Sequence, residues 1–151
     1  ALNYQRLSSR DWVLQTSTLD SKPFLAVDRK ISTRWTTDRA QVPGDFYQID
    51  LGKTETVTRL RLLVGKSKND FPRRFTVHFS MDGRQWELLN PKMTPVLLNW
   101  TGETLLEGSG DLDFIFPAVA MRYLKITQTG QDPEYYWSIH ELELYRNGNK
   151  S

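Results

Sequence analysis

Hydrophobic and polar residues alternate with a period of two along several stretches of this chain. Phe75, Val77 and Phe79 are separated by polar residues, and Leu124 and Ile126 repeat the pattern. A period of two is typical of a β-strand that buries one of its faces. On this basis we expect strands over residues 47–51, 56–64, 75–80, 85–89, 112–116, 123–127 and 138–145.

Turn signals separate these stretches at Pro43-Gly44, Leu51-Gly52, Asp82-Gly83 and Gly108-Ser109-Gly110. The Asp82-Gly83 pair lies between two alternating stretches and therefore predicts a hairpin. Residues 90–110 are polar and contain proline, which predicts a long loop. No amphipathic helix is expected beyond a single turn at residues 23–27. About seven or eight short strands then predict an all-β fold, an antiparallel β-sandwich of the jelly-roll type.

The bulk composition agrees with one folded domain. The 151 residues, 38% hydrophobic and 12% aromatic, suit a single core over residues 1–151, which we expect to be a module of a larger protein. A net charge of +2 gives little attraction to polyanions, so nucleic acid is not an expected partner. The chain has no cysteine, which excludes disulfides, zinc-thiolate sites and thiol nucleophiles. No apolar run approaches the roughly 20 residues that span a bilayer.

Six segments carry a more specific signal: residues 26–35 (AVDRKISTRW), 48–52 (QIDLG), 69–73 (NDFPR), 79–86 (FSMDGRQW), 121–126 (MRYLKI) and 137–145 (WSIHELELY). In this order they resemble the discoidin family, also called F5/8 type C domains. The lack of cysteine favours its bacterial branch, the family 32 carbohydrate-binding modules, because animal members commonly join their ends by a disulfide. The resemblance implies a galactose-binding-domain-like sandwich that is not an enzyme. It also implies a secreted, cell-surface or periplasmic location.

The resemblance further implies a structural Ca²⁺ between the first and the last of these segments. Its ligands would be the side chains of Asp28, Thr33 and Glu141 and the main-chain carbonyls of Leu25, Lys30, Thr33 and His140. Such a set supplies the oxygen ligands, about six to eight, that Ca²⁺ requires. Many relatives have glycine at the position of Arg29, so a positive φ there would strain the backbone.

In sugar-binding relatives, loops at one end of the sandwich present an aromatic ring with polar side chains around it. A pyranose needs this arrangement because it has an apolar face of C–H groups and a rim of hydroxyls. Residues 130–137 resemble the aromatic loop, so Tyr135 or Tyr136 is the predicted platform. Asn69, Lys66 and Arg39 are the predicted hydrogen-bonding residues, with Lys68 as an alternative to Lys66. The expected partners are a glycan or polysaccharide and the other domains of a parent protein.

The sequence does not identify one particular sugar, and it predicts the packing of all but one of the tryptophans. Galactose-binding relatives often have histidine directly after the tryptophan at 35, whereas this chain has Thr36, so galactose is not a specific prediction. Trp12, Trp35, Trp86 and Trp137 are expected to pack in the core because they lie in or beside strand patterns. The position of Trp100, in the predicted long loop, stays open.

Three other functions are alternatives to glycan binding. Catalysis is disfavoured because the two histidines, His78 and His140, have no nucleophile motif near them. Binding to anionic lipid is suggested by Lys66, Lys68, Arg73 and Arg74 beside Phe71, although Asp70 interrupts this cluster and a membrane partner is not the favoured one. A structural spacer that has lost its ligand site is the remaining alternative.

Overall fold

The computed structural model describes residues 3–18, 21–89 and 110–148. These residues form nine strands and one short 3₁₀-helix. In chain order the elements are β1 (Tyr4–Arg6), β2 (Val13–Thr16), η1 (Pro23–Ala26), β3 (Trp35–Ala40), β4 (Phe46–Leu63), β5 (Phe75–Ser80), β6 (Glu87–Leu88), β7 (Leu112–Gln128), β8 (Tyr136–Ile139) and β9 (Glu141–Asn147). Within the described ranges the only helix is η1, and no helix there could span a membrane.

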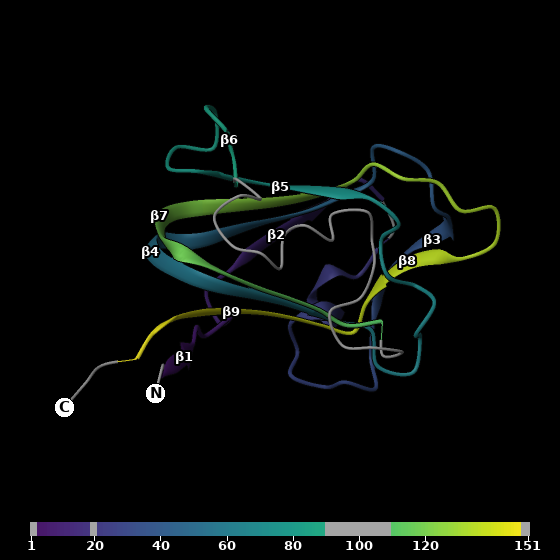
Figure 1. Cartoon of the computed structure of the whole chain (residues 1–151), viewed down its shortest axis with the longest axis horizontal. Helices are drawn as coiled ribbons and strands as arrows, with labels where there is room; N and C mark the ends of the chain where they lie inside the picture. The colour runs from purple at the N-terminus through teal and green to yellow at the C-terminus, as the bar shows by residue number, and fades with distance from the viewer. Residues whose placement is uncertain (1–2, 19–20, 90–109, 149–151) are drawn as a thin grey trace.

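The strands form one large antiparallel sheet and one small one. The large sheet has the order β1-β9-β4-β7-β5-β6, with β2 also paired to β4. The small sheet contains β3 and β8 and lies at one end of the molecule (Figure 1). The all-β antiparallel fold predicted from the period-two pattern is confirmed.

Two long strands turn the large sheet into a sandwich. β4 pairs with β7 over residues 46–50 and again over 55–62, and the register shifts between the two halves. The first half of β4 also pairs with β2, whereas its second half pairs with β9. Figure 1 shows β4 and β7 bending at the same place. Each strand therefore contributes to both layers, which is how bulged strands make the corners of a sandwich.

A single core lies between the layers. Tyr47 and Ile49 in one half of β4 and Leu60 and Leu62 in the other are all buried in the same cluster. The rings of Phe75 and Phe114 meet there with centroids 5.6 Å apart.

The tryptophan predictions are largely confirmed. Trp35 and Trp137 are buried and pack edge to face with centroids 4.9 Å apart. Trp12 packs against the core, and Trp86 is half-buried against Tyr123. Trp100 and residues 90–109 of the predicted loop lie outside the described residues.

Several predicted boundaries differ from the structure. Residues 47–51 and 56–64 belong to one strand, β4, because Gly52, with φ of 83°, marks a bend and not an end. The stretches 112–116 and 123–127 are likewise joined in β7. In contrast, 138–145 is divided at His140 into β8 and β9. The Asp82-Gly83 hairpin is present, since β5 pairs with β6, but its connection covers residues 81–86.

Candidate functional site

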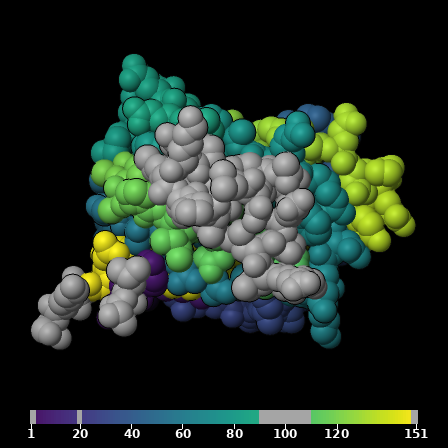
Figure 2. Space-filling model, viewed as in Figure 1, coloured from purple at the N-terminus to yellow at the C-terminus, as the bar shows by residue number. Residues whose placement is uncertain are grey.

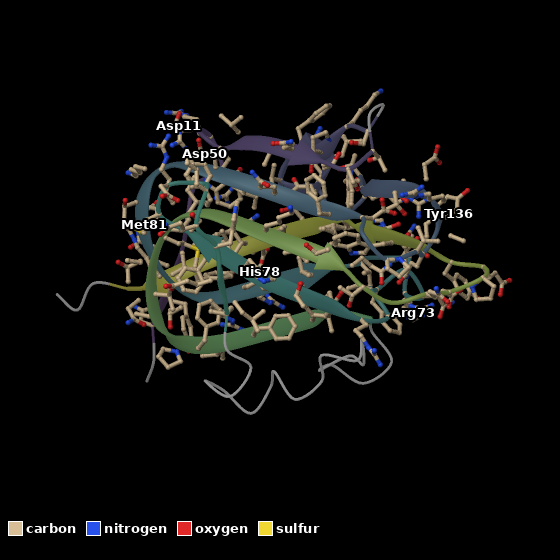
Figure 3. All side chains as sticks on the ribbon, turned by 90° about the horizontal axis from the view of Figure 1, so that it is seen from above. Asp11, Asp50, Arg73, His78, Met81 and Tyr136 are labelled. Carbon is tan, nitrogen blue, oxygen red and sulfur yellow. The ribbon has the colours of Figure 1, made fainter. Side chains whose placement is uncertain are left out.

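Two loops lie beside the small sheet, at the end of the sandwich opposite the chain termini (Figure 1). They are the loop of residues 64–74 between β4 and β5 and the loop of residues 129–135 between β7 and β8. The outer face of β3 lies at the same end. In Figure 3, Tyr136 and Arg73 lie at this end, whereas Asp11, Asp50 and Met81 lie at the other. The segment around residue 130 protrudes from this end in the space-filling view (Figure 2).

The side chains of three predicted calcium ligands, Asp28, Thr33 and Glu141, meet in a clasp between residues 25–33, here called the cation loop, and the start of β9. Thr33 donates a hydrogen bond from its hydroxyl to Asp28 Oδ2 at 2.5 Å. The main-chain N–H of Lys30 lies 3.0 Å from Asp28 Oδ1 and 3.2 Å from Glu141 Oε1. Thr33 Oγ1 is also 3.1 Å from the Lys30 carbonyl and 3.5 Å from that of Leu25. The structure thus brings Asp28 and Glu141 together although they are 113 positions apart in the sequence.

The clasp brings two carboxylates close to each other, and their surroundings shift their pKa values in opposite directions. Burial raises the pKa of Glu141, and the nearby Asp28 raises it further, against the opposing effect of Arg6. Burial also acts to raise the pKa of Asp28, but hydrogen bonds from Thr33 and from the Lys30 N–H outweigh it and lower the net pKa. Arg6 offsets part of this charge through an ion pair with Glu141 Oε2 at 2.7 Å.

The donor set of the clasp fits a hard cation. The atoms that converge are carboxylate, hydroxyl and carbonyl oxygens, which are the ligands Ca²⁺ prefers. Among the described residues no three His, Cys, Asp or Glu side chains gather closely enough to hold a metal alone, so a cation here would depend on hydroxyl and main-chain oxygens. Arg29 has φ of 63°, the left-handed conformation expected where relatives have glycine.

The aromatic loop presents one tyrosine to solvent. Tyr136 is 37% exposed and begins β8, where it lies opposite Ala40 of β3. Because side chains alternate along a strand, Tyr136 points away from the core that Trp137 occupies. Tyr135 is half-buried, and the guanidinium of Arg73 lies 5.6 Å from the centre of its ring. Of the two predicted platforms, Tyr136 has the more accessible ring.

Arg73 holds the two loops together, a role that the sequence analysis did not predict. Its guanidinium donates to Asp132 Oδ2 at 3.0 Å and to the carbonyls of Phe71 and Asn69 at 2.7 Å each. It also lies over the Phe71 ring, 4.3 Å from the centroid. The lipid hypothesis counted Arg73 as a free cation, but its charge is already paired with Asp132.

Gln41 is a second unpredicted anchor of the same loops. Its buried side chain donates to the carbonyls of Phe71 and Tyr136 at 2.9 and 3.2 Å. Its side-chain oxygen accepts from the Arg73 N–H at 2.9 Å. A buried amide that satisfies backbone groups on two loops fixes their relative position. Gln41 lies ahead of the first predicted strand, and nothing local in the sequence identified it.

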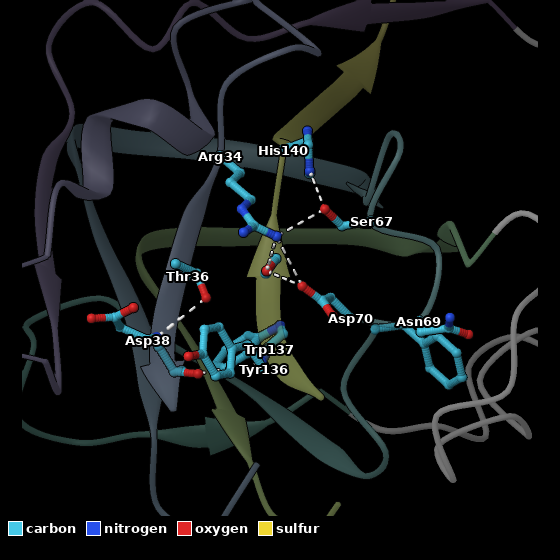
Figure 4. A network of polar contacts seen from close by, with 12 residues as sticks. Arg34, Thr36, Asp38, Ser67, Asn69, Asp70, Tyr136, Trp137 and His140 are labelled. Carbon is cyan, nitrogen blue, oxygen red and sulfur yellow. Dashed lines mark hydrogen bonds and ion pairs between the residues drawn. The ribbon is translucent and has the colours of Figure 1, made fainter. Parts of the chain in front are cut away.

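A polar network lies beneath the outer face of the small sheet (Figure 4). One nitrogen of Arg34, Nη1, contacts Ser67 Oγ at 2.9 Å and Asp70 Oδ2 at 3.1 Å. Asp70, which is mostly buried, also accepts a hydrogen bond from the Ser138 hydroxyl at 2.6 Å. The network therefore connects Arg34, the residue before β3, with β8 and the loop of residues 64–74.

A groove of about 490 Å³ runs along β3. It is lined mainly by hydroxyl and charged side chains, namely Ser17, Thr18, Ser21, Lys22, Leu25, Arg34, Trp35, Thr36, Thr37, Asp38 and Arg39. Asp38 is exposed and has φ of 58°, an unusual backbone conformation that is enriched at functional sites. The strand register places Tyr136 opposite Ala40, two positions along β3 from Asp38.

The remaining predicted ligand residues have different surroundings. Arg39 lines the groove, but its guanidinium makes two hydrogen bonds to the buried Asp45, at 2.6 and 3.1 Å. These bonds raise the pKa of Arg39 and hold its charge beside that carboxylate. Lys66 and Asn69 are exposed on the loop of residues 64–74. In Figure 4 the Asn69 side chain points away from Tyr136, so the structure does not bring these two together.

The structure is a β-sandwich with an oxygen-lined clasp and an aromatic loop. The model of the F5/8 type C domain family matches residues 8–142. The chain therefore belongs to the F5/8 type C domain family, as its six segments predicted. No curated protein sequence gave a match to the chain.

Solved structures with the same fold include several carbohydrate-binding modules. The family 32 module of NanJ from C. perfringens, in complex with galactose, has a TM-score of 0.72 at 18% identity and covers 95% of this chain and 99% of its own. The chitosan-binding module 1 of a Paenibacillus sp. IK-5 chitosanase/glucanase has a TM-score of 0.72 at 21% identity, with coverages of 93% and 98%. The family 32 module of AlyQ, in complex with 4,5-unsaturated mannuronic acid, has a TM-score of 0.65 at 21% identity, with coverages of 87% of this chain and 92% of its own.

These neighbours agree with the prediction of a noncatalytic domain. Each of the three is a binding module, not a catalytic domain, and its fold extends over almost the whole of this chain. Their names specify a neutral sugar, an amino-sugar polymer and an acidic sugar. One backbone fold therefore accommodates sugars of different charge, and specificity must come from the side chains of each module.

Proposed function

We propose that this domain is a noncatalytic carbohydrate-binding module that binds a glycan on the outer face of β3 and β8. The observation that carries the proposal is the exposed ring of Tyr136, paired with β3, the strand that also lines a groove of about 490 Å³. An apolar ring face beside fixed hydroxyl and charged groups suits a pyranose. The neighbours named for galactose, chitosan and mannuronic acid support a carbohydrate as the class of ligand.

A glycan array followed by isothermal titration tests this proposal. We expect Tyr136→Ala to weaken binding of the best array glycan by about tenfold or more, since aromatic contacts are worth roughly 1.5 kcal/mol. Tyr136→Phe keeps the ring face and should retain most of the affinity. Met81→Ala, at the opposite end of the molecule, is the control for an exposed apolar side chain.

Two results would contradict the assignment. Unchanged affinity in Tyr136→Ala would place the site elsewhere. A silent array would favour the structural spacer, unless vesicles containing anionic lipid sediment the protein, in which case the lipid hypothesis gains. The exposed Lys66 and Lys68 are the residues to change in that event.

We also propose that the clasp binds a structural Ca²⁺ through Asp28, Thr33 and Glu141, with carbonyls of the cation loop and of His140 as further ligands. The convergence of two carboxylates in a partly buried position supports this, because a cation between them would offset their repulsion. The ion would hold the cation loop against β9 and would take no part in chemistry. Family membership supports a role in a secreted, cell-surface or periplasmic glycan-active protein with further domains.

A further inference from the structure

His140 lies at the break between β8 and β9 and joins two loops that are distant in the sequence. The imidazole is buried, and both ring nitrogens have partners. Nδ1 is 2.6 Å from the carbonyl oxygen of Ile31 in the cation loop. Nε2 is 2.9 Å from the hydroxyl of Ser67 in the loop of residues 64–74 (Figure 4). One side chain therefore contacts the clasp and the loop that carries Lys66 and Asn69.

The position of this ring is tightly constrained. A β-carbon added at Gly65 would lie 2.8 Å from His140 Nδ1, closer than such atoms approach, and 3.0 Å from the Ile31 oxygen, which is a tight contact. Gly65 also has φ of 50°, which favours glycine. The main-chain N–H of His140 is fixed as well, by a hydrogen bond to the Leu63 carbonyl at 2.8 Å. The ring thus has little room to move without moving Ile31 or Ser67.

A second connection runs parallel to the first. Arg34 directly follows Thr33, a predicted cation ligand, and its Nη1 contacts both Ser67 and Asp70. Main-chain hydrogen bonds from Ser67 to Val64 and from Asp70 to Ser67 make the turns of this loop. The polar contacts that begin at the cation loop and at Arg34 therefore reach Ser67 and Asp70, which shape the loop of residues 64–74.

We propose that His140 and Ser67 couple the clasp to the loop of residues 64–74, so that cation binding orders this loop before the glycan binds. Without a cation, the repulsion between Asp28 and Glu141 favours an outward shift of the cation loop, and such a shift would carry the Ile31 carbonyl away from His140. With a cation the Ile31 contact is kept, and the imidazole stays in place to hold Ser67. His140 acts here as a positioning residue that does not touch the glycan.

The coupling has a reciprocal consequence, which rests on the proposed function. If the cation raises affinity for the glycan, the glycan must raise affinity for the cation by the same factor. Couplings of this kind are typically about fivefold or more.

Calcium alone is the probe for the experiment, so its outcome does not depend on a successful glycan screen. Amide hydrogen exchange at Ser67 and Asp70 is measured by NMR with CaCl₂ and with EGTA, and the thermal midpoint is read in the same samples. In the unmodified chain we expect calcium to slow exchange at Asp70 by about fivefold or more. Ser67→Ala should keep the calcium-dependent rise in the midpoint and lose the slowing.

Matched variants separate coupling from loss of folding. Lys68→Ala changes an exposed side chain of the same loop and should behave like the unmodified chain. His140→Gln, which retains a donor and an acceptor, should restore more of the slowing than His140→Ala. Calcium that raises the midpoint but leaves Asp70 exchange unchanged would overturn the coupling and leave the clasp intact. Equal slowing in Ser67→Ala, or no effect of calcium on either readout, would overturn it too.

Discussion

At the scale of single residues, Arg73 is an anchor of the loops beside the small sheet. It pairs with Asp132, bonds two carbonyls of its own loop and lies between the rings of Phe71 and Tyr135. Lysine cannot reproduce this, because a single ammonium lacks the planar set of donors.

We therefore expect Arg73→Lys to lower the free energy of unfolding by about 2 kcal/mol, the range of hydrogen bonds to charged groups. Glycan affinity should fall as well, since the two loops lose their common anchor. Urea denaturation and titration with the best array glycan measure the two effects. Arg74→Lys, at the exposed neighbouring position, is the control, and an equal effect there would refute the role of Arg73.

The same scale explains which site residues could be predicted. Asp28, Thr33 and Glu141 were found because they belong to family segments, and the structure brings them together. The anchoring roles of Arg73 and Gln41 were not predicted, because Asp132 and Tyr136, partners of Arg73 and Gln41, lie far from them in the sequence. Arg39 was identified by its position in a loop, but only coordinates could reveal its buried partner Asp45.

At the scale of elements, the loop of residues 129–135 contains a carboxylate, Asp132, that bonds both within the loop and to Arg73. Asp132 Oδ1 accepts from the N–H groups of Tyr135 and Glu134 at 2.8 Å each, and Oδ2 accepts from Arg73. These interactions, the Tyr135 N–H first among them, lower the pKa of Asp132. A lowered pKa means that the ionised form stabilises the folded loop.

The stabilisation from Asp132 should be complete above the unfolded pKa of about 3.9 and be lost as the pH falls through the lower folded value. An NMR titration of the Tyr135 and Glu134 amides in acid will therefore show their signals moving together below about pH 4. Asp132→Asn should remove this pH dependence. Amides that do not respond to acid would show that the loop is held by other contacts.

Element boundaries show why the period-two pattern predicted the class of fold better than its strands. Alternation locates a half-buried stretch but does not reveal whether the next stretch is a new strand or the same one after a bend. Gly52 gave a turn signal, yet β4 continues past it with a shifted register. The break at His140 was missed although the alternation changes phase there, since Ile139 and Leu142 are separated by two polar residues.

At the scale of the whole molecule, the clasp ties residues near the start of the chain to β9 near its end. We expect calcium to raise the free energy of unfolding by about 2.7 kcal/mol at 100 times its Kd. The midpoint of thermal unfolding would then rise by about 5 to 10 °C. Differential scanning calorimetry with CaCl₂ and with EGTA measures the shift.

Asp28→Asn and Glu141→Gln should remove this calcium response. Asp11→Asn, which changes an exposed carboxylate outside the clasp, should retain it. If calcium does not change the midpoint of thermal unfolding of the unmodified chain, the clasp does not bind calcium, and Arg6 alone provides its positive charge.

The pairing of β1 with β9 brings the first and last described residues side by side, with the Gly148 N–H bonded to the Asn3 carbonyl at 2.7 Å. Both lie at the end of the sandwich remote from β3 and β8 (Figure 1). A tether attached at either terminus therefore leaves Tyr136 and its groove facing outward. Immobilising the domain on a sensor chip through either end should give the same glycan affinity as free solution. A reporter protein fused to either end should likewise leave the outer face of β3 and β8 accessible.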